Sequence, residues 1–230
     1  MSSIAFLNWL KGIQLLCVLF CFSSCSSTSQ KDESVLASQD SVAIERNADS
    51  AFHSIKQSQN HVHSGDLILR TGKDFTSDVV RKMSKKDPTY SHCGIANWEN
   101  DTLFVYHSLG GQWNPDQTIR RDPYIFFCNP YENKGFGVFR YKINPTQMEH
   151  LIQTTRAFYH QKITFDMQFD LATNDKMYCT EFIYKILLKA LPNEYFIQLS
   201  EINHIPYVAV DNLFLNPHCR EIKRVVFSQP

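Results

Sequence analysis

The chain has 230 residues, of which 43% are hydrophobic, and its 23 basic residues balance its 23 acidic residues. This composition is typical of one globular domain of moderate size. A chain without net positive charge supplies no stripe of Lys and Arg to neutralise phosphates, so we expect no nucleic-acid partner.

The first 25 residues differ in character from the rest of the chain. Lys11 precedes the apolar run GIQLLCVLFCF and the small residues SSC, a layout typical of a secretory signal. The run is too short to cross a bilayer, which takes roughly 20 apolar residues, so a transmembrane anchor is the weaker alternative. FSSC resembles the lipobox of bacterial lipoproteins, which implies that Cys25 is lipidated. We therefore expect residues 1–25 to be a lipoprotein signal peptide, and the protein to be anchored by lipid to a membrane of the bacterial cell envelope.

Residues 26–62 are rich in Ser, Gln, Asp and Asn, which predicts a flexible tether with at most a short helix over Ser41–Gln57. The folded domain is expected over residues 63–230. It begins with a strand at Leu67–Leu69, which follows a glycine turn. A short helix comes next, capped by Thr76 or Ser77 and ended before Pro88.

Two runs rich in β-forming residues, SHCGIANW and DTLFVYHS, predict an antiparallel hairpin. Asn100 and Asp101 suit a two-residue turn between them, which places Glu99 opposite Thr102.

This register brings two histidines together. Gly94 stands opposite His107, and His92 lies two residues before Gly94 on the same face. His92 and His107 are therefore diagonal neighbours, with backbones roughly 7 to 8 Å apart. Glu99 has the opposite parity, which favours His107 as the partner of His92.

Helices and strands complete an α+β pattern, with a small antiparallel sheet packed on helices. Asn144 caps a helix that has Pro145 in its first position. A second apolar helical pattern begins at Cys179 and ends at Pro192. Further strands are expected over GVFRYKI, YVAV and EIKRVVF.

Cys179 is the candidate nucleophile because the unpaired N–H groups of a helix start favour a thiolate. In this hypothesis His92 is the base, His107 orients it through a ring-to-ring hydrogen bond, and the backbone N–H of Cys179 is one oxyanion donor. Two alternatives stay open. Cys179 can be an inert core residue, and the same three side chains can be zinc ligands, although no short ligand spacing supports a metal site.

The segments GDLILR, YSHCGI, VYHS, TFD and YCTEFIYK resemble, in this order, the permuted papain-like amidases of the YaeF/YiiX type, relatives of the NlpC cell-wall peptidases. The order supports a permutation, because His92 precedes Cys179 whereas ordinary papain-like enzymes have the cysteine first. The resemblance runs from about Gly65 to Phe227. It implies a circularly permuted papain-like fold with an antiparallel sheet or barrel packed against helices, and it implies Cys179 as nucleophile, His92 as base and His107 as third member. We expect no cofactor and, from the ligand spacing, no metal.

Three further residues are candidates for contacts to the substrate or the oxyanion. The family's usual Tyr-Asp appears here as Phe165-Asp166, so Tyr178 is a candidate oxyanion donor, with packing as the alternative. Glu181 either caps the helix or binds a substrate amine. Arg70 either holds a substrate carboxylate or forms a surface ion pair.

Function follows from these expectations. We expect a lipid-anchored cysteine amidase or peptidase with a Cys-His-His triad, acting on cell-wall peptides or on N-acylated lipids and amino acids. The alternatives are a catalytically silent module that binds such molecules and a structural envelope protein with paired cysteines. In an oxidising compartment Cys128 and Cys219 can pair, and a core role is equally compatible with the sequence.

Overall fold

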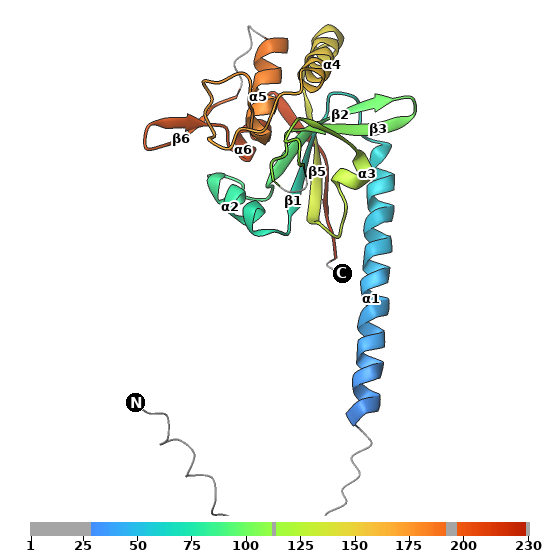
Figure 1. The fold of residues 1–230 in the computed structure, drawn as a ribbon. Coiled ribbons are helices and arrows are strands. Elements are labelled where there is room, and N and C mark those ends of the chain that lie inside the picture. The colour runs from blue at the N-terminus through green and yellow to red at the C-terminus, as the bar shows by residue number, and fades with distance from the viewer. Residues whose placement is uncertain (1–28, 112–113, 192–196, 229–230) are drawn as a thin grey trace, which may run out of the picture. The chain divides into compact units, whose positions relative to one another are not determined.

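The computed structural model describes residues 29–111, 114–191 and 197–228, with side chains from residue 42 onward. The predicted signal peptide, including Cys25, lies outside this part. The chain divides into two units, 1–40 and 41–230, and helix α1 (Ser29–Gln59) contributes residues to both (Figure 1). Within the described residues, no helix is long and apolar enough to span a membrane.

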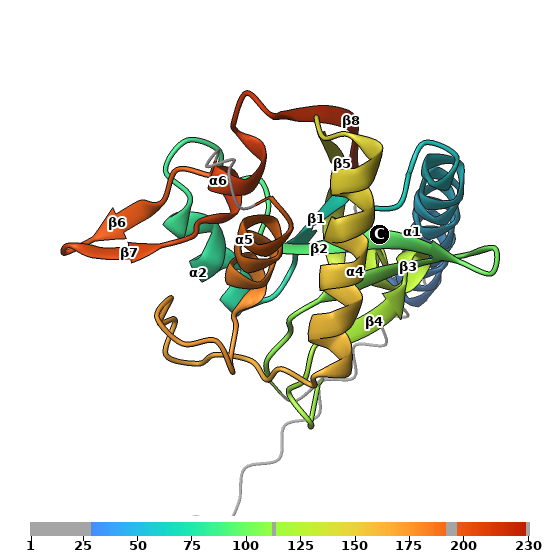
Figure 2. The ribbon, with the colours of Figure 1, turned by 90° about the horizontal axis from the view of Figure 1, so that it is seen from above.

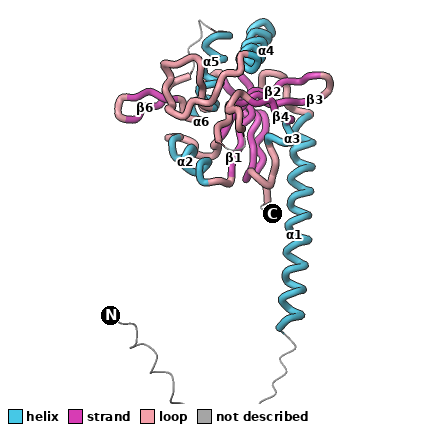
Figure 3. The backbone as a smooth tube through the Cα atoms, in the orientation of Figure 1, coloured by secondary structure: helices cyan, strands magenta, loops and turns pink. Residues whose placement is uncertain are grey.

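The centre of the second unit is one six-stranded antiparallel sheet with the strand order β4-β3-β2-β1-β5-β8 (Figure 3). The strands are β1 (Leu67–Gly72), β2 (His92–Glu99), β3 (Thr102–His107), β4 (Arg120–Pro123), β5 (Asn133–Tyr141) and β8 (Cys219–Val226). The sheet stays open, with β4 and β8 at its edges, so of the two expected forms it is a sheet and not a barrel. A separate ribbon joins β6 (Ser200–Ile202) and β7 (Ile205–Tyr207).

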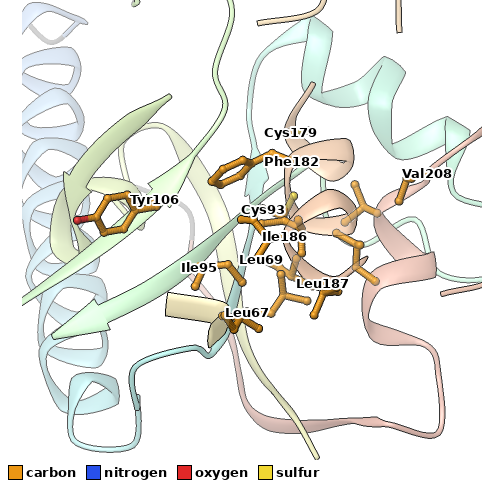
Figure 4. Packing of buried hydrophobic residues seen from close by; sticks show 14 of the residues in the cluster. Leu67, Leu69, Cys93, Ile95, Tyr106, Cys179, Phe182, Ile186, Leu187 and Val208 are labelled. Carbon is orange, nitrogen blue, oxygen red and sulfur yellow. The ribbon is translucent and has the colours of Figure 1, made fainter. Parts of the chain in front are cut away.

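Helices α4 (Pro145–His160) and α5 (Cys179–Ala190) pack against each other over one face of the sheet, and α5 contacts β2 (Figure 2). Apolar side chains from strands and helix fill the space between them (Figure 4). They include Leu67, Leu69, Cys93 and Ile95 from the sheet and Phe182, Ile186 and Leu187 from α5. Burial of this face fixes α5, and thereby the position of Cys179, relative to β2.

The opposite face of the sheet is covered by the second half of α1 and by α3 (Tyr124–Phe127). Ala51 and Ile55 of α1 belong to this second cluster, and the Ser58 hydroxyl lies 2.9 Å from the Tyr124 hydroxyl. The second half of α1 includes the short helix expected over Ser41–Gln57, but it is packed on the sheet and is not a flexible tether. The cause is a narrow stripe of small and apolar residues at helical spacing, Ala48, Ala51 and Ile55, which the polar composition around it conceals.

The predicted N-terminal cap is confirmed for helix α4 and is wrong for helix α2. Asn144 caps α4 in a reciprocal pair with Gln147, as its position before Pro145 predicts. Helix α2 (Phe75–Met83) begins earlier than expected, because Asp74 rather than Thr76 or Ser77 is its cap and accepts a hydrogen bond from the Ser77 N–H.

The segment YVAV is not a strand. Tyr207 ends β7, and Val210 begins the short helix α6 (Val210–Phe214). Between them, the Val208 carbonyl accepts from the Thr180 hydroxyl, and its N–H donates to the Tyr178 hydroxyl. These backbone groups are therefore satisfied by α5 and its cap and not by a neighbouring strand.

Cys128 and Cys219 do not pair. Both are free, buried thiols, and they belong to the clusters on opposite faces of the sheet. Of the two roles open from the sequence, the structure gives them the core role.

Candidate active site

The hairpin has the predicted turn and register. Asn100 and Asp101 both have positive φ, 47° and 64°, as the two central residues of a twisted hairpin turn require. Glu99 pairs with Thr102, and Ile95 pairs with Tyr106. The next opposed pair, Gly94 and His107, is close enough that a Cβ on Gly94 would lie 3.1 Å from the His107 Cβ.

The two histidine rings meet in a hydrogen bond. His92 Nε2 and His107 Nδ1 are 2.9 Å apart, and the rings are nearly perpendicular at 85°. Phe127 from α3 packs against both rings, with centroid distances of 5.7 Å to His92 and 5.0 Å to His107. This aromatic floor limits ring rotation and holds the pair in the orientation that the hydrogen bond needs.

Asp122 extends the pair and is the member that sequence reasoning missed. Its Oδ2 lies 3.1 Å from His107 Nε2, and its Oδ1 accepts from Arg120 at 2.8 Å. Burial opposes ionisation of Asp122, but the hydrogen bonds from His107 and Arg120 outweigh burial and lower its pKa to about 2. Asp122 is therefore a carboxylate at neutral pH.

This carboxylate sets the tautomers of both rings. A carboxylate only accepts, so His107 carries its proton on Nε2 and offers the Nδ1 lone pair to His92. His92 then donates from Nε2, and its Nδ1 is left unprotonated as an acceptor. The hydrogen bonds from Asp122 through His107 to His92 thus leave the Nδ1 lone pair of His92 free. His92 can act as a base at this nitrogen.

Cys179 is the first residue of α5 and stands within hydrogen-bonding reach of His92 and of Cys93. The hydrogen bond from Cys93 lowers the pKa of Cys179, burial opposes it, and His92 and the Thr180 N–H lower it further, so that it falls well below its ordinary value. Burial and the neighbouring Cys179 raise the pKa of Cys93, which stays a thiol and a donor. The pKa values of the two neighbouring thiols are therefore shifted in opposite directions, downward for Cys179 and upward for Cys93.

Both histidines are neutral in the free protein at neutral pH. Burial lowers the pKa of His92 to about 4 although its hydrogen bond with Cys179 opposes this, and the positive charge of Arg70 lowers it further. Burial also lowers the pKa of His107 to about 4, against the opposing effect of Asp122. A neutral His92 next to an acidified thiol is the state from which a proton can be taken.

Tyr178 and Glu181 have structural partners. The Tyr178 hydroxyl accepts from the Val208 N–H at 3.0 Å, and its ring packs on Phe169. Glu181 is fully buried, accepts from the Tyr178 N–H at 3.1 Å and pairs with Lys185 at 2.8 Å. These contacts show Tyr178 packed at the start of α5 and Glu181 capping it. The Tyr178 hydroxyl keeps a proton that it can donate, and contacts of Tyr178, Glu181 and Arg70 to a substrate or an oxyanion stay predictions.

Across the described part of the chain, no group of three or more His, Cys, Asp or Glu side chains is arranged to hold a metal ion. The proton on His92 Nε2 is donated to the lone pair of His107 Nδ1, so both of these nitrogens are engaged in one hydrogen bond. This arrangement suits proton transfer.

No family model matches the chain, and no curated protein sequence matches it. Its structure is similar to a crystal structure described as the metalloprotein YiiX from Escherichia coli O157:H7, with a TM-score of 0.57 and 17% sequence identity. The match covers 74% of this chain and 99% of the other. At this identity the similarity concerns the fold alone. The resemblance that the motifs indicate is thus confirmed at the level of architecture: this chain has the fold of the YiiX type.

Proposed function

We propose that the protein is a cysteine hydrolase that cleaves an amide bond with Cys179 as nucleophile. The observation that carries this proposal is the pair of hydrogen bonds that joins Asp122, His107 and His92, with the thiol of Cys179, the first residue of α5, next to His92. Cysteine, base and orienting group in this order are the requirements for thiol-based acyl transfer.

In the first half-reaction His92 Nδ1 takes the proton of the Cys179 thiol as the sulfur attacks the carbonyl carbon of the amide. The negative charge that develops on the carbonyl oxygen lies near the start of α5, where backbone N–H groups such as that of Cys179 favour it. His107 and Asp122 stabilise the imidazolium that forms on His92.

His92 then returns the proton to the amine as the carbon–nitrogen bond breaks, which leaves a thioester on Cys179. In the second half-reaction His92 takes a proton from water, the hydroxide oxygen attacks the thioester carbon, and the sulfur leaves. The products are a carboxylic acid and an amine, and Cys179 is regenerated.

The test uses a matched pair of cysteines. Cys179 and Cys219 are equally exposed, at 9% each, but burial raises the pKa of Cys219 to about 12. Iodoacetamide at neutral pH should label Cys179 and leave Cys219 unlabelled. Hydrolysis of cell-wall peptides and of N-acylated amino acids, followed by mass spectrometry of the products, should be lost in Cys179→Ala and kept in Cys219→Ala.

Two outcomes would overturn this proposal. A Cys179 that reacts with iodoacetamide no faster than a free model thiol lacks the activation on which the mechanism depends. Saturable binding of the same molecules without turnover would instead identify a silent binding module with the same fold.

We also propose that this activity lies at the cell envelope, where cell-wall peptides and acylated molecules occur, because the sequence predicts a lipid anchor. The sequence FSSC supports the anchor, and the residues concerned lie outside the described part of the chain. Expression in a bacterium that processes lipoproteins should yield a mature protein that begins at an acylated Cys25. Mass spectrometry of the mature N-terminus measures this, with Cys25→Ala as the control that is not acylated.

A further inference from the structure

Arg70 is a half-buried cation of this site, and its charge has no matching carboxylate among the described residues. Its Nε atom is buried without a hydrogen-bond partner, and an NH₂ group of the same side chain makes a long hydrogen bond of 3.4 Å to the Phe127 carbonyl. Within the described residues, no Asp or Glu forms an ion pair with it. Five other arginines do form such pairs: Arg81, Arg120, Arg121, Arg140 and Arg224.

A guanidinium in this state is costly. Removing a charge from water is unfavourable unless an opposite charge and hydrogen bonds replace the lost hydration. Burial lowers the pKa of Arg70, although nearby groups that include Cys128, Asp122 and Cys179 act in the opposite direction. A half-buried arginine with an unpartnered Nε and no ion pair can be completed by an anionic ligand that accepts its hydrogen bonds.

The position of Arg70 connects it to the proposed chemistry. Arg70 stands directly opposite His92 on the neighbouring strand, so both side chains leave the sheet on the same face. Its guanidinium carbon lies 4.9 Å from the centre of the Phe127 ring, the same ring that packs against His92 and His107. The charge of Arg70 also lowers the pKa of both histidines, so it acts at the base itself.

We propose that Arg70 binds a carboxylate of the substrate. This inference rests on the proposed function and narrows it: the substrate is an amide with a free carboxylate beside the scissile bond, as in an N-acylated amino acid or the last peptide bond of a peptide. A guanidinium offers paired donors that match the two oxygens of a carboxylate. N-acyl amides that lack a carboxylate fall outside this class.

A bound carboxylate would also assist the reaction. In the free protein the charge of Arg70 disfavours an imidazolium on His92. A carboxylate on Arg70 compensates that charge, so His92 can accept the proton of Cys179 more readily when such a substrate is bound. Arg70 therefore couples recognition of the correct substrate to activation of the base.

Two alkylating reagents test the inference without a known substrate. Iodoacetate carries a carboxylate and iodoacetamide carries a neutral amide, and both react with the same thiolate of Cys179. The ratio of their rate constants therefore cancels any change in the pKa of that thiol. We expect Arg70→Gln to lower the ratio of iodoacetate to iodoacetamide by roughly ten- to a hundredfold, the range for one lost charge-assisted contact.

Control variants separate a binding role from general effects of charge. Arg156→Gln removes the same charge from an exposed position on α4 and should leave the ratio unchanged. Arg70→Lys keeps the charge but not the paired donors, so its ratio should lie between those of the wild type and Arg70→Gln. It also serves as the second variant if Arg70→Gln does not fold. A ratio that is the same in the wild type, Arg70→Gln and Arg70→Lys would overturn the inference.

A second measurement distinguishes failure of the inference from failure of the proposed function. Wild-type protein is offered N-acyl dipeptides that end in a carboxylate or in a carboxamide. The inference expects kcat/KM to favour the carboxylate by about tenfold or more, and this preference should disappear in Arg70→Gln. Equal, Cys179-dependent hydrolysis of both would refute the role of Arg70 and keep the hydrolase. If the ratio of iodoacetate to iodoacetamide depends on Arg70 as expected but neither dipeptide is hydrolysed, the carboxylate site is supported and the hydrolase is refuted.

Discussion

Replacement of Asp122 by Asn tests whether the carboxylate sets the tautomers of the relay. The Asn side chain fits the same space, but it can present its NH₂ group to His107 Nε2, which then must accept. His107 would carry its proton on Nδ1 and donate to His92 Nε2, and the proton of His92 would move to Nδ1, where the base needs a lone pair.

The magnitude follows from the geometry. The variant loses one charge-assisted hydrogen bond, 3.1 Å long in the wild type, and such bonds contribute about 1.5–3 kcal/mol. This range converts to a loss of roughly ten- to 150-fold in kcat/KM. Complete loss of tautomer control in a triad costs about 10⁴-fold, but Asn can also turn its carbonyl oxygen to His107, so we expect the smaller figure.

The assay compares kcat/KM and the rate of iodoacetamide alkylation in Asp122→Asn with those in Glu99→Gln. Glu99 is a matched control because it pairs with Arg121 of β4, as Asp122 pairs with Arg120, but on the other face of the hairpin. Glu99→Gln should change stability at most. If kcat/KM falls by the same small factor in both variants, Asp122 supports the strand and does not act through the histidines.

Three further predictions concern the fold around the site. Because the pKa of both His92 and His107 falls from 6.5 to about 4 on folding, the unfolded chain binds more protons between these values, and stability is lost as pH falls from about 6.5 to 4, by on the order of 3 kcal/mol for each ring. Urea unfolding at a series of pH values measures this, and a flat profile would contradict neutral burial. Gly94→Ala places a Cβ against Val105 and 2.8 Å from the Tyr106 carbonyl oxygen, so it should cost about 1–3 kcal/mol of unfolding free energy and lower activity; wild-type values would show that the strands can separate without loss. Ile55→Ala should cost about 2–5 kcal/mol, measured by thermal unfolding, whereas exposed Ile44→Ala on the same helix should cost little, and equal effects would argue for a loosely attached helix.

The hairpin was predictable because local signals fix it. Asn100 and Asp101 tolerate positive φ, and strand periodicity of two then determines which residues share a face. The pairing of His92 with His107 follows from that count, since no distant segment takes part in it. Their hydrogen bond is therefore the part of the site whose geometry can be predicted from the sequence.

Asp122 could not be placed in the same way. It lies in RRDPY, which forms the short edge strand β4 and reads from the sequence as a loop. The long connection between β3 and β4 leaves the register of β4 open, so no count of residues predicts that Asp122 pairs with Val105 and reaches His107. Short edge strands carry few of the apolar signals on which strand prediction depends.

The packing of the second half of α1 could not be predicted for a different reason, and that reason bears on the candidate site. Composition predicts a tether, yet Ala51, Ile55 and Ser58 pack on the same side of the sheet as Phe127 of α3. The Phe127 ring packs against both histidine rings. Ser58 contacts Tyr124, the first residue of the helix that presents Phe127. Through α3, this segment therefore supports the rings of His92 and His107. A protein truncated to the domain expected from sequence, residues 63–230, would keep every proposed catalytic residue and lose part of the packing that orients them.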